Sequence, residues 1–192
     1  MEEQEREKDG MKNISIIYDD RLKPGSEIRE ITGEKSFGRV IYKRRSLREI
    51  FSSTAAEALE GIKNTGKIRI WDSLSLSYAE PLPESAVVLI FSDCIIKDKD
   101  EFAIILKKAG YSERSYRVMA GDNVAALIYE SAETFMKEAF MKEGPEEVKE
   151  AALSLGAIES SAFLDISGYD PFLSFITGGF EEIGRASCRE RV

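Results

Sequence analysis

The stretch SAVVLIFSDCIIKDKDE, residues 85–101, decides the fold. Six apolar residues, Ala86–Phe91, run without a break, which is typical of a strand buried on both faces in the middle of an α/β sheet. The run ends at Ser92 and Asp93, and an amphipathic helix pattern then starts near Asp98. Because open α/β sheets bind ligands at the carboxyl ends of their strands, Asp93 is the first candidate site residue.

Strand-like and helix-like segments alternate along the rest of the chain. Residues 13–18 and 67–71 read as strands, and residues 116–119 and 124–129 flank a Gly-Asp-Asn turn as in a hairpin. Ser46 and Glu49 have the spacing of a capping box, which predicts a helix from Leu47. This alternation predicts an α/β fold with a mixed or mostly parallel sheet flanked by helices.

Several helix boundaries follow from local signals. The Ser-Ser-Thr run at 52–54 is expected to interrupt the helix that starts at Leu47. Gly110 is expected to end the helix over 101–109. Asp170 and Pro171 are expected to be the N-cap and first residue of a last helix.

Composition excludes several classes of function. The 192 residues suffice for one domain with a core, and 43% apolar with 32% charged residues is ordinary for a globular protein. A net charge of −8 argues against a nucleic-acid partner, and no apolar run is long enough for a membrane span. The chain has no histidine, which excludes a Ser-His-Asp triad, a histidine general base and a histidine metal site.

The two ends of the chain differ from its middle. Residues 1–12 are charged and without an apolar core, so we expect a disordered lead-in, no signal peptide and a cytoplasmic location. Residues 182–192, EIGRASCRERV, match the translation of a widely used short-read sequencing adapter. We interpret them as a non-native tail, which makes residues 13–181 a single α/β domain and an N-terminal fragment of a longer bacterial protein. The alternative is a genuine basic tail.

Asp93 is the candidate metal ligand. Its carboxylate suits Mg²⁺, which commonly binds one or two protein carboxylates and takes its other oxygens from water and phosphate. The alternative is a loop aspartate that caps a local turn. Asp98 and Asp100 are expected to be a helix cap and part of a solvated face, with a role as ligands as the alternative, and Cys94 is expected to be a small buried apolar residue.

Four basic residues are candidates for binding a phosphorylated substrate. Arg21 and Lys23 follow the first predicted strand, and Lys43 and Arg45 belong to the Lys-Arg-Arg run at 43–45. The alternatives are a solvated turn for the first pair and a solvated face for the second. The chain has no G-x-G-x-x-G or P-loop sequence that would cradle a phosphate.

Two long stretches resemble a known group of proteins. The first is residues 16–51, IIYDDRLKPGSEIREITGEKSFGRVIYKRRSLREIF, and the second is residues 163–181, FLDISGYDPFLSFITGGFE. They are similar to the N-terminal part of bacterial capsular polysaccharide biosynthesis proteins. In that group a kinase-like phosphotransferase region follows. The resemblance implies that the missing C-terminal domain of the same protein is a partner of this chain.

A fainter resemblance is to sugar-phosphate nucleotidyltransferases. Their pattern is a strand, a basic loop with a proline, and a later strand that ends in a metal-binding aspartate. Residues 14–18 with Arg21 and Pro24, and residues 87–91 with Asp93, look like that arrangement, but the glycine-rich nucleotide loop is missing. The resemblance implies a nucleotidyltransferase-like, Rossmann-like layout with Mg²⁺ at Asp93.

These resemblances define the functional hypotheses. The leading one is an N-terminal domain that binds a sugar phosphate or nucleotide sugar for a downstream phosphotransferase region in capsule or surface-polysaccharide biosynthesis. A second is a non-catalytic scaffold whose C-terminal aromatic segment packs on the missing half. A third is an active sugar-phosphate nucleotidyltransferase.

Overall fold

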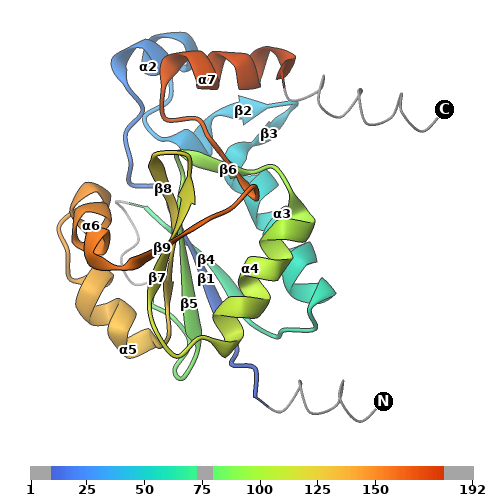
Figure 1. Cartoon of the computed structure of the whole chain (residues 1–192). Helices are drawn as coiled ribbons and strands as arrows, with labels where there is room; N and C mark the ends of the chain where they lie inside the picture. Colours follow the sequence, from blue (N-terminus) through green and yellow to red (C-terminus); the bar gives the residue numbers. More distant parts are fainter. Residues whose placement is uncertain (1–9, 73–79, 180–192) are drawn as a thin grey trace.

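The protein is described by a computed structural model over residues 10–72 and 80–179 (Figure 1). The predicted tail at 182–192 and most of the predicted lead-in at 1–12 lie outside the described residues. The elements in chain order are β1 (Ile14–Asp19), α2 (Ser26–Thr32), η1 (Phe37–Arg39), β2 (Ile41–Tyr42), β3 (Arg45–Ser46), α3 (Leu47–Gly61), β4 (Lys67–Trp71), β5 (Ala86–Phe91), β6 (Cys94–Ile96), α4 (Lys99–Tyr111), β7 (Tyr116–Ala120), β8 (Asn123–Tyr129), α5 (Ala132–Phe135), η3 (Met136–Phe140), α6 (Pro145–Ala151), η4 (Ala152–Ser154), β9 (Gly156–Glu159), β10 (Phe163–Asp165), α7 (Tyr169–Ser174) and η5 (Phe175–Gly179).

A six-stranded mixed sheet forms the centre of the protein, in the order β4-β1-β5-β8-β7-β9. Strand β1 pairs in parallel with both β4 and β5, while β8 runs antiparallel to β5 and β7. Strand β5 therefore lies inside the sheet, and all six of its residues are buried. The predicted α/β class, with a mixed sheet flanked by helices, is confirmed.

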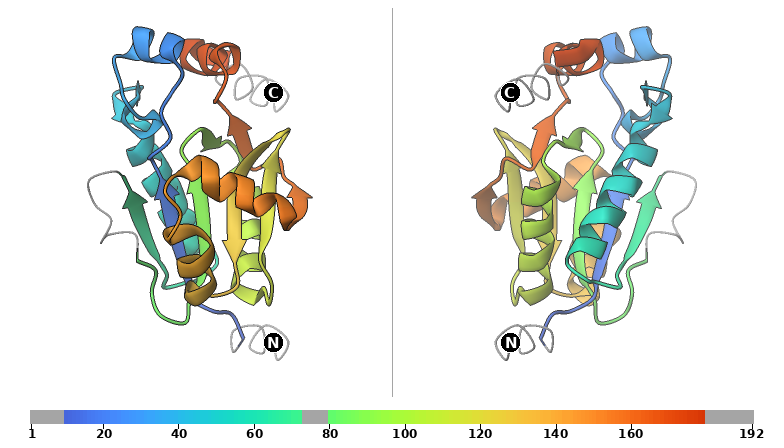
Figure 2. Two further views of the ribbon diagram at one scale, coloured as in Figure 1. Left: turned by 90° about the vertical axis from the view of Figure 1, so that its left-hand side faces the viewer. Right: turned by 90° about the vertical axis from the view of Figure 1, so that its right-hand side faces the viewer.

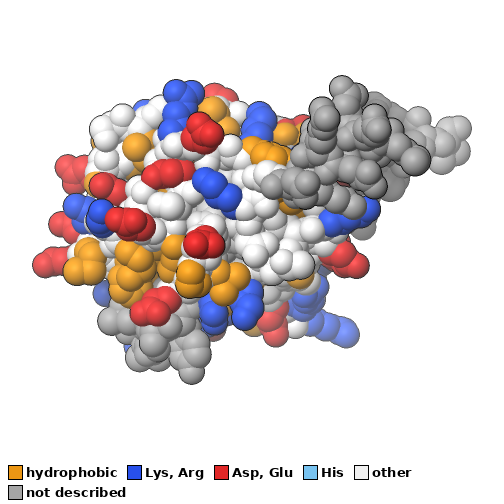
Figure 3. All heavy atoms as spheres, turned by 90° about the horizontal axis from the view of Figure 1, so that it is seen from below, with side chains coloured by type: hydrophobic (Ala, Val, Ile, Leu, Met, Phe, Trp, Pro, Cys, Tyr) orange, Lys and Arg blue, Asp and Glu red, His pale blue; other side chains and the backbone are white. Residues whose placement is uncertain are grey.

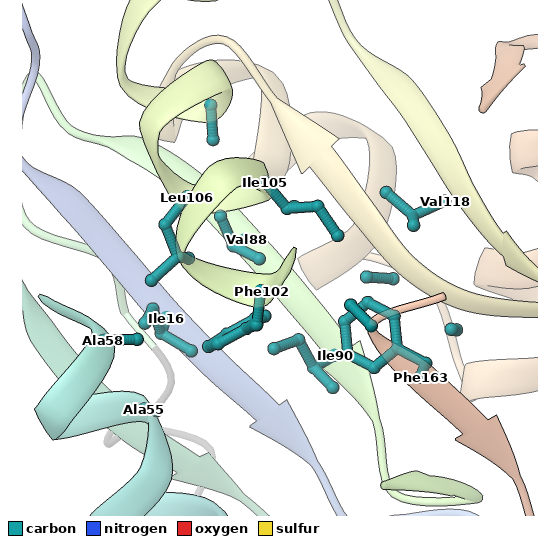
Figure 4. Packing of buried hydrophobic residues seen from close by; sticks show 14 of the residues in the cluster. Ile16, Ala55, Ala58, Val88, Ile90, Phe102, Ile105, Leu106, Val118 and Phe163 are labelled. Atoms are coloured by element: carbon teal, nitrogen blue, oxygen red, sulfur yellow. The ribbon is translucent and has the colours of Figure 1, made fainter. Parts of the chain in front are cut away.

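Helices cover both faces of the sheet, which is why β5 is apolar throughout and every residue of β1 is buried (Figure 2). On one face, Phe102 and Leu106 of α4 pack on Ile16 and Val88, with α3 beside them (Figure 4). On the other face, the side chains of the alternate strand positions pack against α5, η3 and α6. A three-layer arrangement follows from this two-sided burial.

A small cap stands over the carboxyl ends of β1, β4 and β5 (Figure 1). It consists of α2, η1, the β2–β3 hairpin, α7 and η5, so it joins residues 26–46 to residues 169–179. The two helices α2 and α7 are in contact at its top (Figure 2). Phe37 and Phe172 meet edge to face with ring centroids 6.5 Å apart, and Tyr42 stacks on Phe175 at 4.6 Å.

The strongest local signals predicted their elements correctly. The Ser46 hydroxyl accepts from the Glu49 backbone N–H, and the Glu49 carboxylate accepts from the Ser46 backbone N–H, so the capping box is present. Asp98 caps α4 by accepting from the backbone N–H groups of Asp100 and Glu101. The predicted strands at 67–71 and 86–91 and the hairpin are also confirmed.

Three predicted helix boundaries are wrong. The hydroxyls of Ser52 and Thr54 bond to carbonyls one turn earlier, so α3 continues through them. Gly110 lies within α4, where an added Cβ would come 2.5 Å from Met11 Cγ; this glycine permits close packing rather than a helix end. Gly168, not Asp170, is the N-cap of α7, because its carbonyl accepts from the Phe172 N–H.

The face seen from below, opposite the cap, mixes acidic and basic side chains around a band of hydrophobic ones (Figure 3). Neither sign of charge dominates this face. Within residues 10–72 and 80–179, every helix is too short or too polar to span a bilayer.

Candidate functional site

The turn between β5 and β6 places Asp93 at the carboxyl edge of the central strand. The apolar run ends at Phe91, and Ser92 and Asp93 then turn the chain into the short strand β6. Asp93 is 5% exposed, although it carries a carboxylate. A buried carboxylate needs compensating donors or cations, so its surroundings define the site.

Three side chains from distant parts of the chain surround Asp93. Asn123, the first residue of β8, donates from Nδ2 to Asp93 Oδ2 at 3.0 Å and to Asp165 Oδ1 at 3.1 Å. Lys149 of α6 donates from Nζ to Asp93 Oδ2 at 2.7 Å and to Asn123 Oδ1 at 2.9 Å. We call these four residues the Asp93 cluster.

A two-stranded ribbon brings Asp165 to this cluster. Strands β6 and β10 pair antiparallel with Asp165 opposite Cys94, and the backbone N–H of Ile166 donates to the Asp93 carbonyl at 2.9 Å. The backbone N–H of Ser167 donates to Asp165 Oδ1 at 2.9 Å and orients that carboxylate. One amide nitrogen of Asn123 thus bridges two carboxylates.

The cluster has free capacity for a cation. Asp93 Oδ1 and the hydroxyl of Ser92 are buried and have no hydrogen-bond partner in the described structure. Two carboxylates face one ammonium, which leaves a formal excess of negative charge. Across the described ranges, no three acidic or cysteine side chains are arranged to hold a metal. The pair Asp93 and Asp165 fits Mg²⁺, because this ion keeps several water or phosphate oxygens.

Charged side chains of the loop after β1 form ion pairs and hydrogen bonds within the protein. The guanidinium of Arg21 donates to both oxygens of Asp19, at 2.9 and 2.7 Å, and lies 3.4 Å from the ring centroid of Trp71. Burial raises the pKa of the Asp19 carboxyl, and the Arg21 guanidinium opposes that rise. Arg21 therefore compensates a buried charge.

Asp20 joins this loop to the cap. Its carboxylate accepts from the Ser36 hydroxyl at 3.0 Å, from the Gly38 backbone N–H at 2.8 Å and from the Arg48 guanidinium. Asp20 is 3% exposed, so these bonds are made within the protein. The segment after β1 is thereby fastened to the cap by side chains instead of forming a glycine-rich cradle.

The other predicted basic residues lie in two different settings. Lys23 is exposed on the loop after β1. Lys43 and Arg44 form the tight turn of the β2–β3 hairpin with φ of 49° and 70°, and Lys43 lies 5.5 Å above the Tyr42 ring. Arg45 donates to the Glu49 carbonyl and to the Ser53 hydroxyl, which ties the hairpin to α3.

Lys149 is the basic residue that the structure brings to Asp93, and the sequence pattern did not single it out.

Cys94, next to the cluster, is buried as expected. Burial, together with the charges of Asp93 and Asp165, raises the pKa of the Cys94 thiol. These surroundings favour the neutral thiol over the thiolate.

Comparison with known proteins finds similarity in structure and none in sequence. No protein-family model matches the chain, and no curated protein matches it. The CTP:phosphocholine cytidylyltransferase of Streptococcus pneumoniae aligns over 86% of this chain and 98% of that chain, with 12% identity and a TM-score of 0.48. A likeness of this size concerns the general arrangement of strands and helices and assigns no role to a residue. The resemblance to capsular polysaccharide biosynthesis proteins stays a prediction.

Proposed function

We propose that this chain binds a phosphorylated sugar or a nucleotide sugar together with Mg²⁺ at the Asp93 cluster. The observation that carries the proposal is the unpartnered, buried Oδ1 of Asp93 at the carboxyl end of β5. The side-chain amide of Asn123 links the same carboxylate to that of Asp165. In line with the resemblance of residues 16–51 and 163–181, the biological setting is capsule or surface-polysaccharide biosynthesis, with a downstream phosphotransferase region as the recipient of the ligand.

The chemistry of the cluster suits a metal-bridged phosphate. Asp93 and Asp165 would hold Mg²⁺, which supplies positive charge to phosphate oxygens when bound. Lys149 adds an ammonium on the same side, and the exposed Lys23 adds another charge on the loop after β1. No histidine is needed for such binding, since positioning and charge compensation suffice.

Binding without transfer is favoured over an active nucleotidyltransferase by the loop after β1. In the predicted reaction, a sugar phosphate would displace pyrophosphate from a nucleoside triphosphate, and the triphosphate would need its own cradle. Here Arg21 is held by Asp19 and Trp71, and Asp20 is held by the cap. Of the two basic residues proposed for phosphate in this loop, Arg21 therefore already has a partner, and the exposed Lys23 alone would make a weak cradle.

A scaffold that uses the C-terminal aromatic segment has less support. Phe172 and Phe175 are 0% and 4% exposed, and they pack against Phe37 and Tyr42 of the same chain. These rings complete the cap, so they are not presented to another domain.

Calorimetric titration with sugar 1-phosphates and nucleotide sugars, with and without Mg²⁺, tests the proposal. We expect binding heat that depends on Mg²⁺ and is lost in Asp93→Asn. The matched control is Asp122→Asn, which removes the same charge from an exposed residue next to Asn123.

Three outcomes have distinct meanings. Absence of heat across the whole panel would overturn the proposal and favour the scaffold. Binding that Asp93→Asn and Asp122→Asn affect equally would place the ligand elsewhere. Release of pyrophosphate from a nucleoside triphosphate in the presence of a sugar 1-phosphate would establish the active nucleotidyltransferase instead.

A further inference from the structure

The Asp93 cluster already contains a cation in the form of the Lys149 ammonium. Its Nζ lies 2.7 Å from Asp93 Oδ2 and 2.9 Å from Asn123 Oδ1, and 4.7 Å from the centroid of the Phe91 ring. A carboxylate oxygen and an amide oxygen are ligands that a hard divalent cation also takes. Lys149 therefore occupies oxygens of the same cluster, on the same carboxylate as the unpartnered Asp93 Oδ1 proposed for Mg²⁺.

Mg²⁺ and the Lys149 ammonium are competitors at this position, because two like charges at contact distance repel. The helix α6 is fixed by the fully buried Val148, whereas the Lys149 side chain is 17% exposed and has a flexible four-carbon stem. The side chain can turn outward while the helix stays in place. We therefore expect metal binding to break the Lys149–Asp93 ion pair and to leave the position of α6 unchanged.

The displaced ammonium remains close to the cluster, where an anion bound to the metal would attract it. Asp93 and Asp165 together carry two negative charges, which one Mg²⁺ would neutralise, so the metal-bound cluster would no longer attract Lys149. A phosphate group bound to the same metal supplies the missing anion. Metal and phosphate thus favour each other through Lys149.

We infer that Lys149 is an internal counter-ion that excludes free Mg²⁺ from the Asp93 cluster and admits the metal only together with a phosphorylated ligand. This inference rests on the proposed function, since it assumes that the cluster binds a metal. It adds a coupling between the binding of the metal and the binding of phosphate, which Asp93 and Asp165 alone would not produce. By linkage, the metal raises the affinity for phosphate by the same factor as phosphate raises that for the metal.

Electron paramagnetic resonance of Mn²⁺, used as a probe for Mg²⁺, tests the inference without any assay of activity. The free ion is titrated into the full chain alone and in the presence of pyrophosphate as the simplest phosphate ligand, with the pyrophosphate–Mn²⁺ complex measured separately. The variants are Lys149→Met and Lys149→Gln, the second of which keeps a neutral donor for Asp93 and guards against loss of the fold. Lys35→Met is the control at an exposed lysine. Urea unfolding confirms that each variant is folded.

We expect the unaltered chain and Lys35→Met to bind Mn²⁺ at least roughly tenfold more tightly with pyrophosphate than without it. Lys149→Gln should bind Mn²⁺ alone at least roughly tenfold more tightly than the unaltered chain, and pyrophosphate should help it much less. If the unaltered chain binds Mn²⁺ alone as tightly as Lys149→Gln does, or if pyrophosphate helps both equally, the inference is wrong while the metal site stands. If no form binds Mn²⁺ under either condition, the metal site of the proposed function is wrong as well.

Discussion

The backbone N–H of Gly38 donates a 2.8 Å hydrogen bond to Oδ1 of Asp20, and the carboxylate leaves no room for a side chain at position 38. An added Cβ at Gly38 would overlap the Asp20 carboxylate. This contact joins the end of β1 to the cap. Because the contact tolerates no added atom, a substitution at Gly38 tests whether it holds the cap to the end of β1.

Gly38→Ala is expected to lower the free energy of unfolding by about 1–3 kcal/mol, the usual range for overpacking a well-filled site. Urea unfolding measures the loss. The control is Gly61→Ala in the last turn of α3, where an added Cβ meets no atom within 4 Å and alanine favours the helix. Equal effects at the two positions would contradict the tight contact.

Arg21→Met is expected to destabilise the protein by about 3–5 kcal/mol near pH 7, because it leaves the carboxylate of Asp19 buried without a counter-ion. Burial already raises the pKa of Asp19, and loss of the guanidinium raises it further. A carboxyl whose pKa rises on folding stabilises the fold below its unfolded-state pKa and loses that contribution as pH rises through the folded-state pKa. The penalty of Arg21→Met should therefore be smaller near pH 4 than near pH 7.

Urea unfolding of the Arg21 variant at both pH values checks this, with Arg29→Met on the exposed face of α2 as control. An equal penalty at the two pH values would show that Arg21 acts through packing on Trp71 and not through its charge.

Ser46→Ala is expected to cost about 1 kcal/mol of unfolding free energy, since it removes the side-chain half of the capping box at the start of α3. Thermal or urea unfolding detects the change. Ser52→Ala in the same helix is the matched control, because its hydroxyl only bonds back to the Arg48 carbonyl and alanine is the better helix former. A larger loss at Ser52 than at Ser46 would argue against the cap.

Cys94 is expected to resist alkylation by iodoacetamide in the folded protein near pH 8 and to react fully in denaturant. The side chain is 1% exposed, and burial beside Asp93 and Asp165 raises the pKa of its thiol. Mass spectrometry of the peptide that contains Cys94 distinguishes this thiol from Cys188. Rapid labelling of Cys94 in the native state would contradict its place in the core.

Burial explains which elements could be predicted from the sequence. Every residue of β1 and β5 is buried, so β5 appears as an unbroken apolar run and β1 as a mainly apolar one that Ser15 interrupts and Asp19 ends. In α2 only Ile28 is buried, and β9 exposes three of its four residues, so neither leaves a periodic pattern. Both elements are held by their neighbours in the fold, which a local pattern does not encode.

The site was predictable only in its first member. Asp93 follows an obvious strand, whereas Asn123, Lys149 and Asp165 reach it through the hairpin, a helix and the β6–β10 ribbon. Asn123 opens the second strand of the predicted hairpin and Asp165 ends a short apolar run, so a correct strand order would have placed both at the same edge as Asp93. Lys149 lies among other charged residues of α6 and has no such signal. The choice of Arg21 for phosphate could not anticipate its pairing with Asp19, which depends on the fold around Trp71.

The pairing of β6 with β10 also sets the order in which the cluster can assemble during synthesis. Asp93 and Asn123 emerge from the ribosome well before Asp165, and the chain must close a long loop before the second carboxylate arrives. A nascent chain that stops short of β10 would therefore carry the core of the sheet but only half of the acidic pair. If the cluster binds its ligand as proposed, its full set of side chains is present only once the chain extends past residue 165.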